Sequence, residues 1–63
     1  MSVGENIKDM RERLNLTQQE LSEKSGVTQS MISQIELGLK QPSFQAAVLI
    51  AKALNCTTDA LAK

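Results

Sequence analysis

Two helix-start signals stand close together near the N-terminus, and they limit what this chain can fold into. Ser2 is followed three residues later by Glu5, and Thr17 is followed three residues later by Glu20. This is the capping-box pattern, in which the hydroxyl accepts a first-turn amide and the glutamate accepts the amide of the cap residue. The pattern predicts one helix after Ser2 and another after Thr17, so the first helix must be short.

The remaining start and stop signals divide the rest of the chain in the same way. Asn15, Gly26 and Asn55 are residues that readily adopt the left-handed conformation that ends a helix. The predicted helices are Val3 to about Leu14, Gln18 to Ser25, a third between Thr28 and Gly38, a fourth from about Phe44 to Leu54, and a last turn capped by Thr57 or Thr58. No segment alternates with a period of two, so the predicted fold is all-α, a compact five-helix bundle.

Composition restricts the function. The chain has 63 residues, enough for one domain over 1–63. Seven basic residues balance seven acidic ones, which excludes a strongly basic nucleic-acid glue. With no histidine and one cysteine, we expect no enzyme, no metal site, no cofactor and no disulfide. Without an apolar run long enough to span a bilayer or a signal peptide, we expect a cytoplasmic protein with no membrane partner.

Helices this short are not stable alone, so they must pack on one another. The apolar residues at helical spacing give the predicted core: Ile7, Met10, Leu14, Leu16, Leu21, Val27, Ile32, Ile35, Phe44, Ile50 and Leu54.

The third helix has a distinctive outer face. At 100° per residue, Ile32 and Ile35 face the core. The residues facing away are uncharged and polar except for one leucine: Gln29 at the edge, Ser30, Ser33, Gln34 and Leu37. Such groups suit base edges in a major groove, where glutamine pairs with adenine. The alternative is an ordinary solvated face.

The segment from Thr17 to Glu36, followed by Gly38, Lys40, Pro42-Ser43-Phe44 and Ile50-Ala51-Lys52-Ala53-Leu54, resembles the phage lambda-type repressor and Cro family of helix-turn-helix domains. The resemblance covers nearly the whole chain. It implies a helix-turn-helix over about residues 17–37, whose second helix enters the major groove.

The resemblance also implies site residues. The base-contacting positions match Gln29, Ser30, Ser33 and Gln34. The phosphate-contacting positions match Thr17, Gln18, Thr28, Lys40 and Ser43. Helix N-termini carry free amides and bind anions without net positive charge, which agrees with these roles. Lys40 would also fit an ordinary solvated lysine.

Arg11 and Glu36 flank the apolar stripes of the first and third helices. Opposite charges beside two core faces predict a partly buried structural ion pair, which the resemblance supports. The alternative is two side chains that extend separately into water.

Some positions depart from the family pattern. Leu37 and Leu39 stand where it usually has polar or basic residues, and Leu49 falls where the fourth helix should be polar. With Leu61 near the end, these leucines are candidates for a protein interface. Isolated exposed leucines are also ordinary, and Leu61 would equally fit the core. Ser25 replaces an apolar residue.

The leading hypothesis is a bacterial or phage-encoded, nucleoid-associated transcriptional regulator, and more specifically a repressor. It would bind double-stranded DNA site-specifically as a homodimer on a pseudo-palindrome, with no small-molecule ligand in this domain. The rival is a protein-interaction module on the same scaffold, such as an antitoxin-like partner with weak DNA binding. The leucines and the zero net charge favour the rival.

Overall fold

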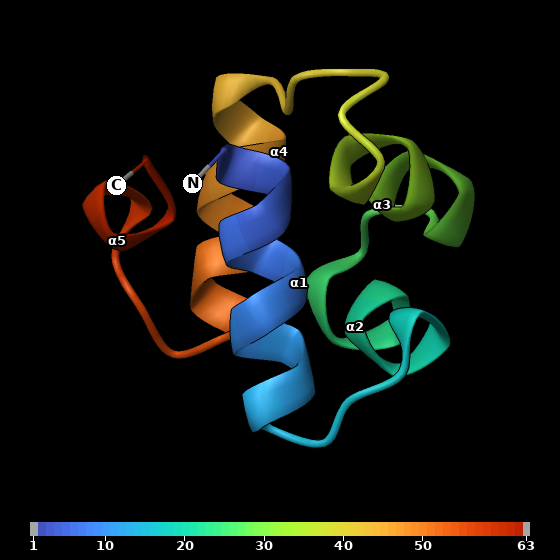
Figure 1. The fold of residues 1–63 in the computed structure, drawn as a ribbon. Coiled ribbons are helices and arrows are strands. Elements are labelled where there is room, and N and C mark those ends of the chain that lie inside the picture. Colours follow the sequence, from blue (N-terminus) through green and yellow to red (C-terminus); the bar gives the residue numbers. More distant parts are fainter. Residues whose placement is uncertain (1, 63) are drawn as a thin grey trace.

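The computed structural model describes residues 2–62, which form five α-helices and no strand (Figure 1). The helices are α1 (Val3–Arg13), α2 (Gln18–Ser25), α3 (Gln29–Glu36), α4 (Phe44–Ala53) and α5 (Thr58–Ala62). The predicted all-α, five-helix fold is confirmed; the predicted domain ends, Met1 and Lys63, lie outside the described residues. No helix within 2–62 has the length and apolar character needed to cross a membrane.

Both predicted capping boxes are present. The amide of Glu5 donates to Ser2 Oγ over 3.1 Å, and that of Glu20 donates to Thr17 Oγ1 over 3.0 Å. In return, the Glu5 carboxylate accepts the Ser2 amide and the Glu20 carboxylate accepts the Thr17 amide. These hydrogen bonds favour the charged carboxylates, so they lower the pKa of both glutamates.

The helices also end where left-handed residues were predicted. Asn15, Gly26 and Asn55 have φ angles of 59°, 78° and 56°. Asparagine tolerates this conformation because its short side chain can hydrogen-bond locally, and glycine adopts it without steric cost.

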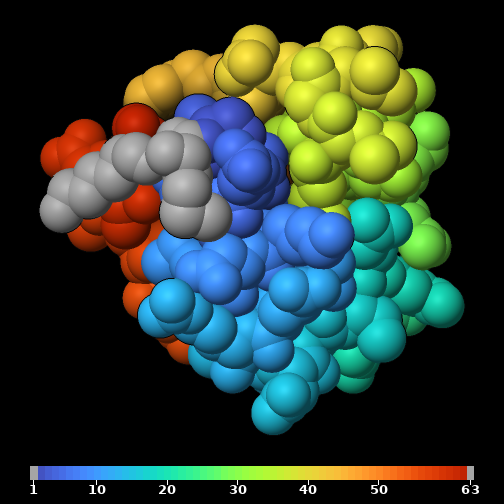
Figure 2. Space-filling model, viewed as in Figure 1, coloured from blue at the N-terminus to red at the C-terminus, as the bar shows by residue number. Residues whose placement is uncertain are grey.

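The five helices surround one small core. α1 packs against α3 and α5, α2 packs against α3 and α4, and α4 packs against α5 (Figure 1). The space-filling view shows α1 running across one face, with α2 and the segment after α3 beside it (Figure 2). The buried apolar residues are Ile7, Leu21, Val27, Ile32, Ile35, Ile50, Ala51, Leu54 and Leu61.

Two predicted core residues lie at the surface. Leu14 is 47% exposed and Phe44 is 83% exposed, so both predictions were wrong. Each stands at a helix end, Leu14 as the residue that caps α1 and Phe44 as the first residue of α4. An apolar pattern that is followed to the very end of a helix overestimates the burial of the terminal residue. Met10 and Leu16 are half-buried and pack against the core.

The predicted exposure of Leu49 was also wrong. Leu49 is half-buried and packs against the core, together with Ala46 and Ala53 on the same helix. These residues lie on one stripe with Ile50 and Leu54, spaced three or four residues apart. Leu61 is 2% exposed and belongs to the core, so it is not available as a protein interface.

Two polar or small residues of α1 have structural roles that the sequence pattern did not reveal. Gly4 is buried against the backbone of α3, where a β-carbon would collide with the carbonyl oxygen of Ile35. Asn6 is also buried, and its Nδ2 donates to the carbonyl oxygen of Leu61 over 2.8 Å. Gly4 allows α1 to approach α3 closely, and Asn6 ties α1 to α5.

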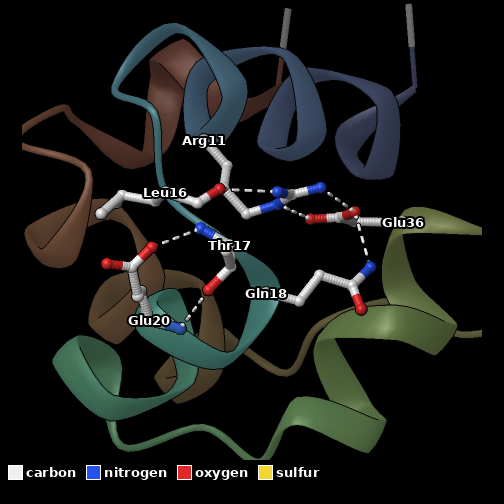
Figure 3. Close-up of polar contacts among 6 residues, drawn as sticks. All are labelled: Arg11, Leu16, Thr17, Gln18, Glu20 and Glu36. Carbon is white, nitrogen blue, oxygen red and sulfur yellow. Dashed lines mark hydrogen bonds and ion pairs between the residues drawn. The ribbon is translucent and has the colours of Figure 1, made fainter.

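The ion pair between Arg11 and Glu36 is present at the junction of α1 and α3 (Figure 3). Arg11 Nε lies 2.8 Å from Glu36 Oε2, and Arg11 Nη2 lies 3.1 Å from Oε1. Arg11 Nη1 donates to the carbonyl oxygen of Leu16 over 2.7 Å. The side chains are only 10% and 3% exposed, and the hydrogen bonds to Glu36 raise the pKa of Arg11. One guanidinium therefore holds α1, the loop to α2 and α3 together.

We predict that Gly4→Ala destabilises the domain by about 1–3 kcal/mol, because the added methyl group must displace α3. This loss opposes the gain in helix propensity that alanine normally gives. Urea denaturation followed by circular dichroism measures it. The exposed Lys8→Ala variant of the same helix is the control, with an expected change within about 0.5 kcal/mol. A Gly4→Ala variant more stable than the parent would contradict the close approach.

We predict that Glu36→Ala destabilises the domain by about 3–5 kcal/mol, because it leaves the Arg11 charge buried without its partner. The control is Asp9→Ala, which breaks the Arg13–Asp9 pair, whose side chains are 77% and 43% exposed. Exposed pairs of this kind contribute at most about 0.5 kcal/mol. Chemical denaturation compares the two variants, and a Glu36→Ala loss below about 1 kcal/mol would show that the buried pair contributes little.

Candidate nucleic-acid interface

A short hydrogen-bonded turn joins α2 to α3. The Gly26 amide donates to the carbonyl oxygen of Ser22 over 2.9 Å and closes α2. Val27 then enters the core, and Ser25, also buried, accepts the Val27 amide through its Oγ over 3.1 Å. The serine that departs from the family pattern thus has a hydrogen-bond partner within the turn. Fixed in this way, α2 and α3 form the predicted helix-turn-helix.

The outer face of α3 is arranged as the sequence predicts, but its residues are not equally accessible. Ile32 and Ile35 are buried on the inner face. Gln29 and Ser30 are exposed, whereas Ser33 and Gln34 are half-buried. The first turn of α3 therefore presents its polar side chains most fully. All four of these outward-facing residues of α3 are uncharged.

The starts of α2, α3 and α4 are exposed and similarly capped. Thr17 Oγ1, Thr28 Oγ1 and Ser43 Oγ each accept the amide three residues later, over 3.0, 3.2 and 3.1 Å. The other first-turn amides of an α-helix have no partner within the helix, and the helix dipole makes this end positive. Lys40 is exposed in the loop before α4.

Gln18 has a contact that sequence reasoning missed. Its Nε2 donates to Glu36 Oε1 over 3.0 Å, so its side chain extends the Arg11–Glu36 pair to α2 (Figure 3). The amide oxygen of Gln18 points away from Glu36. No short-range signal marks this contact, because the two residues meet only after α2 and α3 have packed.

Cys56 is half-buried and packs against the core. Burial raises the pKa of its thiol, which disfavours the reactive thiolate. Within residues 2–62, no group of three or more His, Cys, Asp or Glu residues is placed to hold a metal ion.

The interface therefore combines two chemical capacities. Uncharged amides and hydroxyls on α3 both donate and accept hydrogen bonds, as base edges require. Helix starts on α2, α3 and α4 offer amides to anions such as phosphate.

Comparison with known proteins places this arrangement in a family. Residues 7–61 match the family model described as helix-turn-helix. An uncharacterised helix-turn-helix transcriptional regulator of Mycobacterium tuberculosis is 38% identical over 58 residues, which are 92% of this chain and 41% of that protein. The immunity repressor of Bacillus phage phi105 is 34% identical over 61 residues, 97% of this chain and 42% of the repressor. The chain thus spans about two fifths of the length of these two relatives.

Comparison with solved structures gives the same family assignment. The P22 c2 repressor in complex with a synthetic operator superposes with a TM-score of 0.93 at 33% identity, over 100% of this chain and 96% of that one. The solution structure of the P22 c2 DNA-binding domain gives a TM-score of 0.92 over 97% of this chain and 80% of that one. These matches show that the chain belongs to the lambda-type repressor family of helix-turn-helix transcriptional regulators.

Proposed function

We propose that this chain is the DNA-reading domain of a transcriptional repressor, which binds a specific double-stranded site with α3 in the major groove. The observation that carries the proposal is the uncharged outer face of α3, where Gln29 and Ser30 are exposed at its first turn. A protein with the same fold, the P22 c2 repressor, has been solved in complex with a synthetic operator. Gln29, Ser30, Ser33 and Gln34 are the proposed base-contacting residues.

Phosphate contacts would position α3 on the duplex. The proposed contacts are Thr17, Gln18, Thr28, Lys40 and Ser43, which stand at the starts of α2, α3 and α4 or in the loop between α3 and α4. Four of the five act through helix starts rather than through a cationic side chain, so the domain needs no excess of basic residues. The bond from Gln18 to Glu36 uses one of the two Nε2 hydrogens, so the other Nε2 hydrogen and the first amides of α2 are left for this role.

Binding would involve two copies of the chain. Helix-turn-helix repressors bind two-fold-related half-sites about 34 Å apart, one helical turn of DNA. We propose a homodimer on such a pseudo-palindrome, since a single α3 reads too few base pairs to specify one site in a genome.

We predict that selection from a random duplex library at low salt recovers a two-fold-related motif. Gln29→Ala should lower affinity for that motif by about 1–3 kcal/mol and relax the preference at one base pair of each half-site. Sequencing of the bound pools measures both effects. Glu23→Ala, an exposed change on α2 outside the proposed contacts, is the control and should leave the motif unchanged. An unaltered motif with Gln29→Ala would remove Gln29 from the base-reading set.

We predict a different result for Lys40→Ala. Because a phosphate contact carries no sequence information, this variant should weaken binding to all duplexes about equally and reduce the salt dependence by about one counterion. Lys52→Ala, a change at the opposite end of α4 from Ser43, is the matched lysine control. Affinity titrations at several salt concentrations make the comparison. Equal salt slopes for Lys40→Ala and the parent would show that Lys40 is an ordinary solvated lysine.

A bound pool identical to the input library would contradict the proposed function itself. The rival interpretation, a protein-interaction module, would then account for the exposed leucines after α3 better than DNA reading does.

A further inference from the structure

A small pocket lies between the ends of α1 and α4, and it shares no residue with the proposed DNA contacts. Met10, Arg13 and Leu14 line it from α1 and its cap, and Leu54 lines it from the end of α4. Both helices end toward the lower side of the molecule in Figure 1. The pocket has a volume of about 200 Å³ and is open to solvent. We propose that it receives one aromatic side chain of a partner protein.

The volume of the pocket suits a single ring. An apolar cavity of about 150 Å³ in another protein holds a benzene molecule, whereas drug-sized ligands occupy roughly 300 Å³ or more. At about 200 Å³, the pocket accommodates one ring and little else. Because an open pocket covers only part of the ring, it serves as one anchor within a larger protein contact. Aromatic side chains seated in pockets are the usual anchors of such contacts.

Three of the four lining side chains are apolar. Leu54 is 4% exposed and Met10 is half-buried against the core, so packing holds both in place. Leu14 is 47% exposed and offers the pocket apolar surface that the domain itself leaves uncovered. The thioether of Met10 also adds a preference, because a polarisable sulfur makes favourable contacts with aromatic rings.

The fourth lining residue, Arg13, strengthens the preference for a ring. A guanidinium donates hydrogen bonds in its plane and attracts an aromatic ring over its face. Arg13 Nε lies 3.0 Å from Asp9 Oδ2, one turn earlier on α1. This contact occupies one edge of the guanidinium and leaves its face for stacking. An aliphatic side chain in the pocket would gain the apolar contacts but not the cation–π attraction.

The chain does not supply this ring to its own pocket. It has no tryptophan, no tyrosine and one phenylalanine, Phe44. Phe44 is the first residue of α4 and Leu54 caps the other end, which puts the two about 15 Å apart along the helix. The Phe44 ring is 83% exposed. A partner that brings its own aromatic residue to the pocket would leave every proposed DNA contact uncovered.

The test titrates the folded chain with two neutral probes and follows its methyl NMR resonances. N-acetylphenylalaninamide should shift the methyl resonances of Met10, Leu14 and Leu54 saturably through ring currents, with a Kd on the order of 1–10 mM. The cyclohexylalanine analogue, which differs only in its saturated ring, should bind at least about 3-fold more weakly. Methyl groups of the exposed Leu37 and Leu39, outside the pocket, should not shift. Equal affinities for the two probes, equal shifts at Leu37 and Leu39, or no saturable shift would overturn the proposal.

The variant Arg13→Gln isolates the guanidinium, because glutamine keeps a planar group without the charge. It should weaken the phenylalanine probe at least about 3-fold and leave the cyclohexyl probe within about 2-fold of the parent. Lys8→Ala, an exposed change on the same helix outside the pocket, is the control and should match the parent. Thermal melting verifies that both variants are folded. An Arg13→Gln variant with parental affinity for the phenylalanine probe would contradict the proposed stacking.

Dilution of the parent without any probe tests the identity of the occupant. The methyl resonances of the pocket should not depend on protein concentration. Pocket resonances that move on dilution, and stop moving in Phe44→Ser, would show that Phe44 of a second copy fills the pocket, and the partner-protein proposal would fall.

Discussion

The structure depends on one buried guanidinium. Arg11 joins three parts of the chain that are distant in sequence: its own helix α1, the carbonyl oxygen of Leu16 before α2, and the carboxylate of Glu36 at the end of α3. Burial of two charges is expensive, and this cost is offset because each nitrogen of the guanidinium and both oxygens of the carboxylate have a hydrogen-bond partner. Through Gln18, the same carboxylate also holds the start of α2. The start of α2 and the end of α3 are therefore tied through one carboxylate, in addition to their contacts in the apolar core.

Much of the backbone was predictable, because its determinants are local. Caps at Ser2, Thr17, Thr28 and Ser43 and stops at Asn15, Gly26 and Asn55 act within one helical turn. Side-chain burial was less predictable, because it depends on how helices cross. Leu14 and Phe44 belong to apolar patterns that extend to the helix ends, beyond the part of each helix that contacts the core. Val48 and Leu49 are adjacent in sequence and both apolar, so the sequence pattern does not show which of them faces the core. Only the packing of α4 places Leu49 against it.

The same distinction applies to the candidate interface. The outer face of α3 follows from helical geometry once Ile32 and Ile35 are assigned to the core. The Arg11–Glu36 pair can be predicted from the sequence, because each charge flanks the apolar stripe of its helix. Two other contacts cannot be predicted from the sequence: that of Gln18 with Glu36, and that of Gly4 with the Ile35 carbonyl. Each joins two helices that come together only when the chain folds. A glycine within an otherwise regular helical pattern was the one available hint of close packing.

Among the proposed DNA contacts only Lys40 is charged, and this has a consequence for how such a domain would search a genome. Non-specific attraction to DNA arises almost wholly from cationic groups that displace counterions. A domain whose seven basic residues are balanced by seven acidic ones would spend little time on unrelated sequences if, as we propose, it contacts phosphates mainly through helix starts. Fewer molecules would be withheld by the large excess of competing sites, so a small cellular pool could keep its site occupied. Dissociation from that site would also be followed by diffusion through solution rather than by prolonged sliding along the duplex.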